Sequence, residues 1–372
     1  MKPSDISSLA ARAGREHAWQ TVAAGARRDV VQATALLESN DILALGAMAD
    51  FARARVVGDE VYFICNRHIN HTNVCRNRCL FCAFSHDEGD ADAYTLSIDE
   101  VVDKARETLA AGGITEIHIV GGEHPDLPFA YYLEMMRALK ELAPDVHIQA
   151  FTASEIAHFA KISDKSVDEV LAELKLAGLG SLPGGGAEIF AARVRGLIAP
   201  GKEPAEEWFH VHDTAHKMGI PTHCTLLYGH VETYEERVDH MLRLRAQQDE
   251  TGGFLAFIPL AFHPENTVFE RRGFRFTTGA DDLKMIAVSR LLLDNIPNIK
   301  AYWIMMGLPM AQLALHFGAN DVQGTVVREQ IFQAAGATSG TEQKVSELVR
   351  FIKDAGRAPV QRDTLYNELC RW

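Results

Sequence analysis

The chain has 372 residues, 47% hydrophobic and 23% charged, which is enough apolar material for a large core. Its formal net charge of -13 disfavours a nucleic-acid-binding surface. No apolar run reaches the ~20 residues that a membrane helix needs, and the first residues lack an apolar signal core. The six cysteines are few for a chain of this length, which favours metal ligation over disulfides. We therefore expect a cytoplasmic protein that binds neither nucleic acid nor a membrane.

The chain begins with helices and then repeats one pattern. Residues 1–56 have the apolar spacing of helices. From residue 61 onward, short β-rich runs alternate with Gly-, Pro- or His-rich loops and amphipathic helices. The predicted strands are 61–69, 114–120, 146–151, 179–182, 221–228, 254–260 and 299–305, with a weaker one at 317–321. The predicted helices between them are 98–111, 129–142, 166–177, 204–218, 234–249 and 280–295.

This alternation predicts parallel βα units. Seven or eight such units in ~270 residues predict a (β/α)8 TIM-type barrel, complete or nearly so, and an open doubly wound sheet is the alternative. We expect an N-terminal helical extension (1–56), the barrel (57–335) and a C-terminal helical extension (336–372) packed on the barrel. In a barrel the loops after the strands form the active-site face, so the polar residues of those loops are the candidates for function.

The loop after the first predicted strand carries Cys75, Cys79 and Cys82 at C-x3-C-x2-C spacing. A closed zinc site needs a fourth ligand, and none follows at zinc-finger spacing, although His71 or His86 could supply one. Three thiolates suit a 4Fe–4S cluster in which one iron is left open to a further ligand. We therefore predict that the three cysteines hold a 4Fe–4S cluster.

Three other strand-end loops carry residues suited to binding a ligand. The Gly-Gly-Glu turn at 121–123 lets the backbone approach a ligand closely, and the alternative is an ordinary strand–helix turn. Thr152 and Ser154 offer hydroxyls to a ribose, although Ser154 could instead cap a helix. Glu188 follows three glycines and could pair with an ammonium group.

Longer segments around these residues resemble one group of enzymes. The segments are NHTNVCRNRCLFCAF, HIVGGEHPDLPFAYYLEMMRALK, IQAFTASEI, LPGGGAEIF, IPLAFHPENT and FGANDVQGT. The cysteine motif, with Phe81 before its third cysteine, resembles radical S-adenosylmethionine (SAM) enzymes. Over nearly the whole chain the combination resembles the aminofutalosine synthase family of the menaquinone pathway. Its sister groups, cyclic dehypoxanthinylfutalosine synthase and the FO synthase subunits, stay alternatives, and a non-catalytic iron–sulfur protein is a more remote one.

The resemblance implies a cofactor set and a reaction. It implies one 4Fe–4S cluster, SAM as co-substrate, and a flavodoxin or ferredoxin as electron donor. In this family the 5′-deoxyadenosyl radical of SAM adds to the enolpyruvyl double bond of 3-[(1-carboxyvinyl)oxy]benzoate. Rearrangement with decarboxylation then gives 6-amino-6-deoxyfutalosine. The residues that we expect to bind SAM are Gly121, Gly122, Glu123, Thr152, Ser154 and Glu188.

The implied acceptor carries two carboxylates, which require neutral or cationic hydrogen-bond donors. We expect such donors beside the cysteines and on the later strand-end loops. The predicted substrate-pocket residues are His71, Asn73, His263, Asn320 and Thr325.

Overall fold

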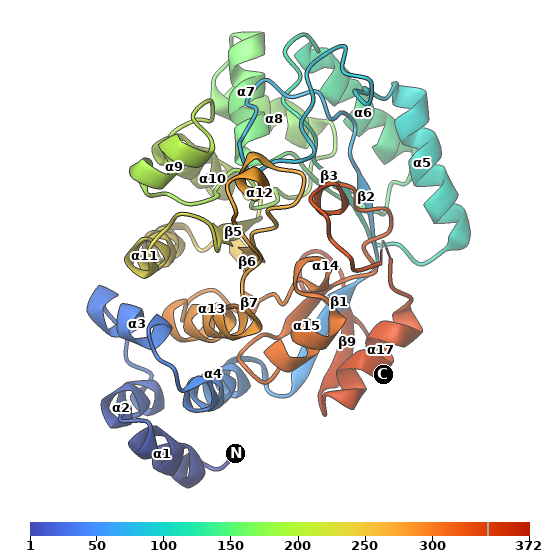
Figure 1. Cartoon of the computed structure of the whole chain (residues 1–372). Coiled ribbons are helices and arrows are strands. Elements are labelled where there is room, and N and C mark those ends of the chain that lie inside the picture. Colours follow the sequence, from blue (N-terminus) through green and yellow to red (C-terminus); the bar gives the residue numbers. More distant parts are fainter. Residues whose placement is uncertain (341) are drawn as a thin grey trace.

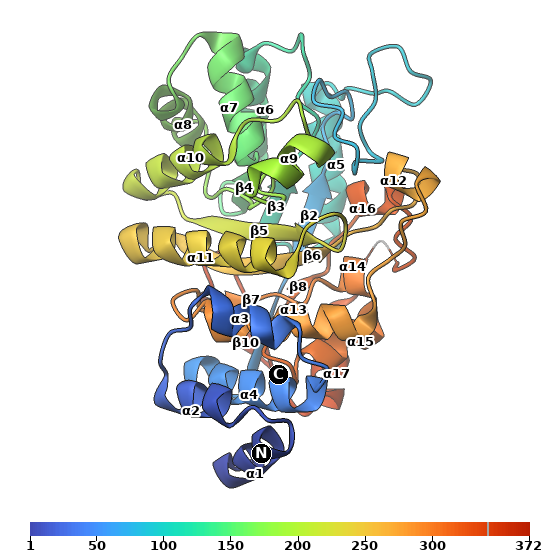
Figure 2. The same ribbon diagram turned by 60° about the vertical axis from the view of Figure 1, so that its left-hand side comes forward.

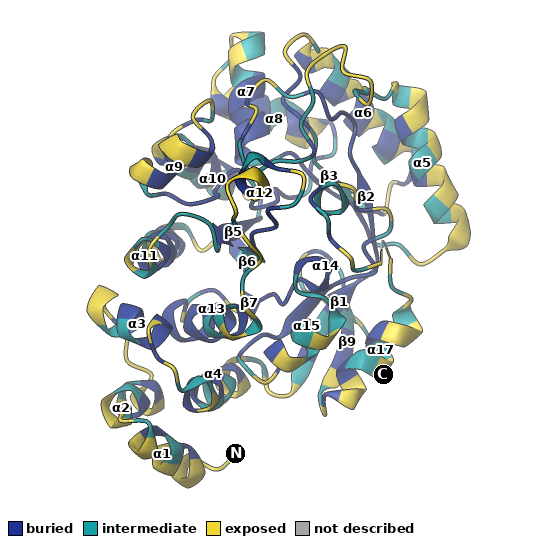
Figure 3. Ribbon diagram, viewed as in Figure 1, coloured by how far each residue is buried: buried dark blue, intermediate teal, exposed yellow. Residues whose placement is uncertain are grey.

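The structure is an α/β fold in which mostly parallel strands lie inside a layer of helices (Figure 1). The computed structural model describes residues 1–340 and 342–372. The strands are β1 (Glu60–Ile64), β2 (Asn66–Ile69), β3 (Glu116–Ile119), β4 (His147–Ala150), β5 (Thr222–Tyr228), β6 (Phe254–Ala261), β7 (Asn298–Ile299), β8 (Asp321–Gly324), β9 (Ala358–Arg362) and β10 (Glu368–Arg371). Strands β1 to β8 are largely buried, as Figure 3 shows by colour, whereas β10 is mostly exposed.

The strands form three sheets, ordered β10-β9-β1-β8, β2-β3-β4 and β5-β6-β7. Isolated parallel bridges join the sheets to one another: Arg67 to Val327, Gln149 to Ser181, Leu182 to Thr222, and Lys300 to Asp321. From β2, these pairings lead through every later strand to β8, which pairs in parallel with β1. Because the strands run in parallel, their carboxyl ends and the loops after them gather at one side of the sheets.

Most of the predicted strands are present, with four differences. The run predicted at 61–69 is divided at Cys65 into β1 and β2, which belong to different sheets. Residues 179–182 contribute bridges at Ser181 and Leu182 but no continuous strand. The strand predicted at 299–305 ends early, because residues from Trp303 form a short helix. The weak strand predicted at 317–321 lies a few residues later, as β8, since Gly318 makes a turn with φ of 105°.

All six predicted helices between the strands are present within a few residues of their predicted ends. Ser97 and Ser166 cap their helices through capping boxes. The sequence reading missed α7, α9 and several short helices. The helices after β2 are α5 (Ile98–Ala111), α6 (Phe129–Leu142), α7 (Ala153–Ser163), α8 (Val167–Leu176), α9 (Ala192–Ile198), α10 (Ala205–Lys217), α11 (Tyr234–Thr251), α12 (Val268–Arg271), α13 (Gly279–Leu292), α14 (Trp303–Met306), α15 (Leu308–Ala314), α16 (Ile331–Ala334) and α17 (Val345–Asp354).

The N-terminal residues are helical, as predicted, and pack on the outer helices. The four helices are α1 (Pro3–Arg12), α2 (Glu16–Ala24), α3 (Val30–Leu37) and α4 (Ile42–Val57). Helix α4 packs on α13, and α3 packs on α11 and α13 (Figures 1 and 2). Arg27 bonds Asp249 at 2.5 Å and Asp294 at 2.9 Å, which ties the first helices to the main fold. In the described part of the chain, no helix is both long enough and apolar enough to span a membrane.

The C-terminal residues differ from the helical extension that the sequence predicts. Helix α17 is present, but the polar end after it forms β9 and β10. Strand β9 pairs in parallel with β1, and β10 pairs antiparallel with β9. Val360 of β9 is fully buried, and Arg362 forms a buried ion pair with Asp321 at 2.7 Å. The C-terminal strands are therefore built into the sheet that contains β1. The domain boundaries at 57 and 335 stay a prediction.

Candidate active site

A cavity of about 290 Å3 lies at the carboxyl ends of the strands. Its walls include the apolar side chains of Leu227, Ile258, Leu260, Phe262 and Met305. Ten of the fourteen predicted site residues line it: Cys75, Cys79, Cys82, Gly121, Gly122, Glu123, Thr152, Ser154, Glu188 and His263. The cavity therefore brings the cysteine loop together with every predicted SAM-binding residue.

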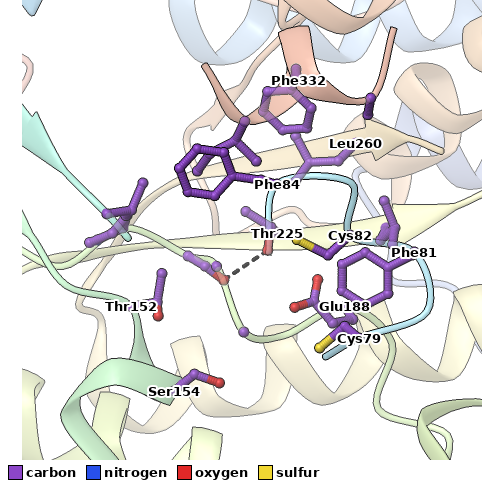
Figure 4. A pocket seen from close by; sticks show the side chains of 18 of the residues that line it. Cys79, Phe81, Cys82, Phe84, Thr152, Ser154, Glu188, Thr225, Leu260 and Phe332 are labelled. Carbon is purple, nitrogen blue, oxygen red and sulfur yellow. Dashed lines mark hydrogen bonds between the residues drawn. The ribbon is translucent and has the colours of Figure 1, made fainter. Parts of the chain in front are cut away.

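The cysteine loop presents its thiols to one wall of the cavity, and Figure 4 shows Cys79 and Cys82 there, with Phe81 and Glu188. The loop is fixed by its backbone, because the N–H of Cys75 donates to His86 at 3.1 Å and that of Cys82 to Cys79 at 3.0 Å. Among the described residues, no three His, Cys, Asp or Glu side chains lie close enough to hold a single metal ion. A structural zinc ion needs four ligands around one centre, whereas three thiolates are the set that a cubane cluster uses.

The Gly-Gly-Glu turn after β3 holds the cysteine loop in place. A Cβ on Gly122 would lie 2.1 Å from the carbonyl oxygen of Val74, so only glycine fits there without a shift of the backbone. The Glu123 carboxylate accepts a hydrogen bond from Asn77 at 2.5 Å. Burial raises the pKa of Glu123 to about 8, against the opposing effect of the Lys202 charge. The turn is thus a structural support as well as a cavity wall.

The loop after β4 forms a capping box in which Thr152, rather than Ser154, caps α7. Glu155 accepts hydrogen bonds from the Thr152 N–H at 2.7 Å and from the Gly121 N–H at 3.1 Å. Burial raises the pKa of Glu155 to about 7, although these N–H groups lower it. The Ser154 hydroxyl donates to Glu203 at 2.5 Å. Thr152 and Ser154 both line the cavity, so their oxygens remain within reach of a ligand (Figure 4).

Glu188 has a partner that the sequence analysis missed. It lies in the left-handed region, with φ of 43°, and is bonded to the Lys202 ammonium. Burial alone would lower the pKa of Lys202, but Glu188, Cys79 and Glu203 raise it above its ordinary value, so the lysine is charged. Its ammonium lies 5.9 Å from the centre of the Phe81 ring. Lys202 comes from the loop between α9 and α10, and only its Ala-Pro-Gly-Lys-Glu-Pro surroundings could have indicated it.

Two predicted substrate residues near the cysteines do not line the cavity. His71 is fully buried, with its ring edge-on to Tyr132 at 5.5 Å and to Phe151 at 6.2 Å. Burial lowers the pKa of His71 to about 3, so its ring is neutral. Asn73 donates to the carbonyl of Asp92 at 2.8 Å and accepts from the N–H of Tyr94 at 2.7 Å. Both residues therefore shape the loop that carries the cysteines.

Two predicted substrate residues, one on each side of β8, also lie outside the cavity lining. Asn320 accepts from Arg290 at 2.6 Å and from the N–H of Ile299 at 2.9 Å. The Thr325 hydroxyl accepts from the N–H of Asn66 at 3.0 Å and donates to its carbonyl at 3.1 Å. These bonds join β8 to its neighbours. The structure thus gives both residues a structural role, and their predicted substrate role has no support from the cavity lining.

His263 does line the cavity, and the structure defines which of its nitrogens carries the proton. The Nε2 atom lies 3.0 Å from the carbonyl oxygen of Met305, which can only accept. Burial lowers the pKa of His263, so the ring is neutral and Nδ1 is an acceptor. Protonation would therefore be needed before His263 could donate a second hydrogen bond to a carboxylate.

The sequence analysis also missed a polar layer inside the strands. Side chains of β3, β4, β5 and β8, with one lysine after β7, reach the cavity from below the loop residues. They are His118, Gln149, His223, Lys300 and Gln323.

Comparisons with known proteins place this arrangement in a family. The profile of the Radical SAM superfamily matches residues 69–244, and that of the CofH/MqnC C-terminal region matches residues 251–370. The aminodeoxyfutalosine synthase of Thermus thermophilus is 47% identical over 355 residues, which cover 95% of each chain. The chain belongs to the aminodeoxyfutalosine synthase family of radical SAM proteins. The synthase of Streptomyces coelicolor is 46% identical, over 94% of this chain and 92% of that protein.

A second group of relatives has nearly the same sequence identity to this chain. A 5-amino-6-(D-ribitylamino)uracil–L-tyrosine 4-hydroxyphenyl transferase of Methanopyrus kandleri is 46% identical over 318 residues, covering 85% of this chain and 86% of that protein. Among solved structures, methylornithine synthase (PylB) has a TM-score of 0.72 at 20% identity, covering 91% of this chain and 96% of its own. The FeFe-hydrogenase maturase HydG of Carboxydothermus hydrogenoformans has a TM-score of 0.70 at 16% identity, covering 98% and 86%. These two likenesses concern the fold.

The residues of this family member fit the cofactors of the superfamily, which are a 4Fe–4S cluster and SAM. Three cysteines line one cavity, at the strand-end loop where the superfamily motif lies. Burial raises the pKa of the Cys75 and Cys79 thiols, so a nearby positive charge is needed to favour the thiolates. A bound iron cluster supplies such a charge, as does Lys202 at Cys79. Cys75, Cys79 and Cys82 are therefore the residues that would hold the cluster.

Proposed function

We propose that this protein is an aminodeoxyfutalosine synthase, which joins the 5′-deoxyadenosyl group of SAM to 3-[(1-carboxyvinyl)oxy]benzoate. Methionine would be released and the enolpyruvyl carboxylate lost as carbon dioxide or bicarbonate, and the product would be 6-amino-6-deoxyfutalosine, a precursor in menaquinone synthesis. The observation that carries the proposal is the 47% identity to a synthase over 95% of both chains. The cavity supports it, because the three cysteines and a mostly apolar chamber share one space.

In this proposal, the cluster and SAM, when bound, supply an organic radical, and the protein's residues position the reactants. The Gly121–Glu123 turn and Glu188 offer acceptors for the ammonium group of SAM. Thr152 and Ser154 lie on the wall where a ribose would be bound. The apolar side chains of Leu260 and Phe262 exclude water and so limit side reactions of a radical.

We also propose that the strands close into a complete (β/α)8 barrel. The bridges from Arg67 to Val327 and from Lys300 to Asp321 support this, because they connect the ends of the three sheets. A barrel explains why the cavity lies at the carboxyl ends of the strands, where such folds hold their active sites. A flavodoxin or ferredoxin is the proposed electron donor.

The test is an anaerobic assay of the purified, cluster-loaded protein with SAM, dithionite and the enolpyruvyl benzoate. We expect a product in which the nucleoside is joined to the acceptor, identified by mass spectrometry, together with methionine. The Cys79→Ala variant is the matched control and should give no such product. Parallel reactions with L-tyrosine and 5-amino-6-(D-ribitylamino)uracil test the activity of the transferase relatives. Turnover of that pair, without an adduct from the benzoate, would assign the protein to the transferases instead.

A further inference from the structure

The floor of the cavity carries polar groups that the cofactors do not require. His118, Gln149, His223, Lys300 and Gln323 all line the cavity and lie on different strands or directly after one. His118 and Gln149 are register partners on β3 and β4. Four of these positions are within strands and Lys300 directly follows β7, whereas the cysteines are on a loop beyond the carboxyl end of β2. The floor and the cysteine loop therefore lie at different levels of the same cavity.

A chain of hydrogen bonds defines the protonation of His223. His118 Nδ1 donates to the side-chain oxygen of Gln149 at 2.8 Å, and the Gln149 amide nitrogen donates to His223 Nδ1 at 2.9 Å. Burial and the charge of Lys300 lower the pKa of His223 well below its ordinary value, so its ring is neutral. Because Nδ1 accepts, the proton must be on Nε2. In the described part of the chain, this buried Nε2 has no hydrogen-bond partner.

In the described part of the chain, the Lys300 ammonium uses one of its three hydrogen-bond donors. Its side chain is buried, at 1% exposure, and its ammonium donates to Gln323 at 2.7 Å. An ammonium has three donors, and among the described residues no carboxylate forms an ion pair with this one. The other lysine of the cavity, Lys202, is already paired with Glu188. Lys300 is thus the lysine of the described cavity lining that lacks an anionic partner.

The two carboxylates nearest to Lys300 in its electrostatic environment, Asp321 and Glu116, bond to other residues. Asp321 accepts from Arg362 at 2.8 Å, and Glu116 accepts from Thr364 at 2.8 Å. Burial lowers the pKa of Lys300 to about 8, with Asp321 opposing this effect and Arg362 adding to it. The lysine is therefore still mostly cationic at neutral pH. A buried cation without an anionic partner and a buried N–H without an acceptor are both costly, and a bound anion would satisfy both.

We infer that the Lys300 ammonium and the His223 Nε2–H bind the ring carboxylate of an aryl carboxylate substrate. This inference rests on the proposed function. The double bond of the acceptor must react near the cysteine loop, and the enolpyruvyl carboxylate is attached directly to that double bond. The carboxylate on the benzene ring is farther away and is the one that reaches the floor. Between the two levels, Leu227, Ile258 and Met305 provide apolar surface for the ring.

The test compares the benzoate with 3-[(1-carboxyvinyl)oxy]benzamide, which lacks the ring charge but keeps its shape. Equilibrium binding is measured by calorimetry on the anaerobic, cluster-loaded protein with SAM and without reductant, so that no turnover occurs. We expect the wild-type protein to bind the acid roughly 10- to 150-fold more tightly than the amide, the range of one charge-assisted hydrogen bond. In Lys300→Met the ratio of the two dissociation constants should fall close to one. Lys353→Met, an exposed change on α17, should keep the wild-type ratio.

A second variant provides an independent test in case Lys300→Met does not fold. His223→Leu removes a neutral donor and should lower the preference for the acid about 2- to 10-fold. If both folded variants keep the wild-type ratio, or if wild type binds acid and amide equally, the assignment of the floor is wrong. The product assay separates this inference from the proposed function. If wild type forms the adduct but both variants keep the wild-type ratio of dissociation constants, the carboxylate site is wrong and the proposed function stands. A Lys300-dependent preference without any adduct would refute the proposed function and leave the floor as an aryl carboxylate site.

Discussion

Replacing Gly122 by alanine tests whether the turn after β3 holds the cysteine loop. The added Cβ would lie 2.1 Å from the Val74 carbonyl oxygen and 3.0 Å from the Cβ of Cys75. Ordinary contact begins at 3.4 Å, so the two loops must separate by about 1.3 Å, the difference from 2.1 Å. Metal–ligand distances tolerate only about 0.2 Å. Gly122→Ala should therefore lower the free energy of unfolding by about 1–3 kcal/mol and impair cluster binding.

The assay is anaerobic reconstitution followed by iron and sulfide analysis, with urea denaturation of the cluster-free protein. Gly196→Ala is the matched control, because Gly196 lies inside helix α9 and a Cβ there would meet nothing within 4 Å. That variant should bind iron as wild type does and be unchanged or slightly more stable, by up to about 1 kcal/mol. If Gly122→Ala keeps both wild-type iron content and wild-type stability, the turn does not support the cysteine loop.

Three further predictions concern the cluster and two buried ionic groups. Cys79→Ala should lose most of the reconstituted iron and sulfide while the circular dichroism spectrum stays that of a folded protein; full iron content would contradict the ligand assignment. Burial alone would raise the pKa of Glu232, but His230 and Arg237 lower it to about 2, so its charge adds stability above pH 4.5 that is lost as pH falls toward 2. Glu232→Gln should therefore lower the free energy of unfolding by about 3 kcal/mol at pH 7, and the difference from wild type should shrink in acid; a pH-independent difference would refute this. Asp321→Asn leaves the buried Arg362 charge unpaired and should cost about 3–5 kcal/mol in urea denaturation, most of which a second change, Arg362→Met, should restore.

The alternation of strands and helices could be predicted from the sequence, because each element depends mainly on residues close to it in the chain. Helices α5 and α6 begin and end at the predicted residues, because apolar spacing, and for α5 the capping box at Ser97, depends only on residues close together in the sequence. Strand β9 was missed because its pairing with β1 joins residues about 300 positions apart, as in Glu60 and Ala358. Strand β10 pairs only with β9, so it depends on the same distant pairing. Nothing near Val360 indicates that its side chain will be buried.

The site was predictable to the extent that it lies on strand-end loops. Cys75 and its two partner cysteines, the Gly-Gly-Glu turn and Glu188 were found by that rule, and all line the cavity. The rule failed for Asn320, because a residue beside a strand end can bond to neighbouring backbone instead of a ligand. It also overlooked polar residues inside apolar strands. His223 in Thr-His-Cys-Thr-Leu-Leu-Tyr is such a case, and the unexpected polarity of that strand is the signal that could have found it.

The position of β1 has a consequence for synthesis on the ribosome. Tyr62 of β1 pairs with Asp321 of β8, so its partner is made about 260 residues later. At ~5–20 residues per second, roughly 13 to 50 seconds separate the two. During that interval the cysteine loop, which follows β2, has been translated, but the later walls of the cavity are still being made. We therefore expect iron delivery to this protein to follow release of the finished chain, because only then is there a chamber that keeps water and oxygen from a cluster.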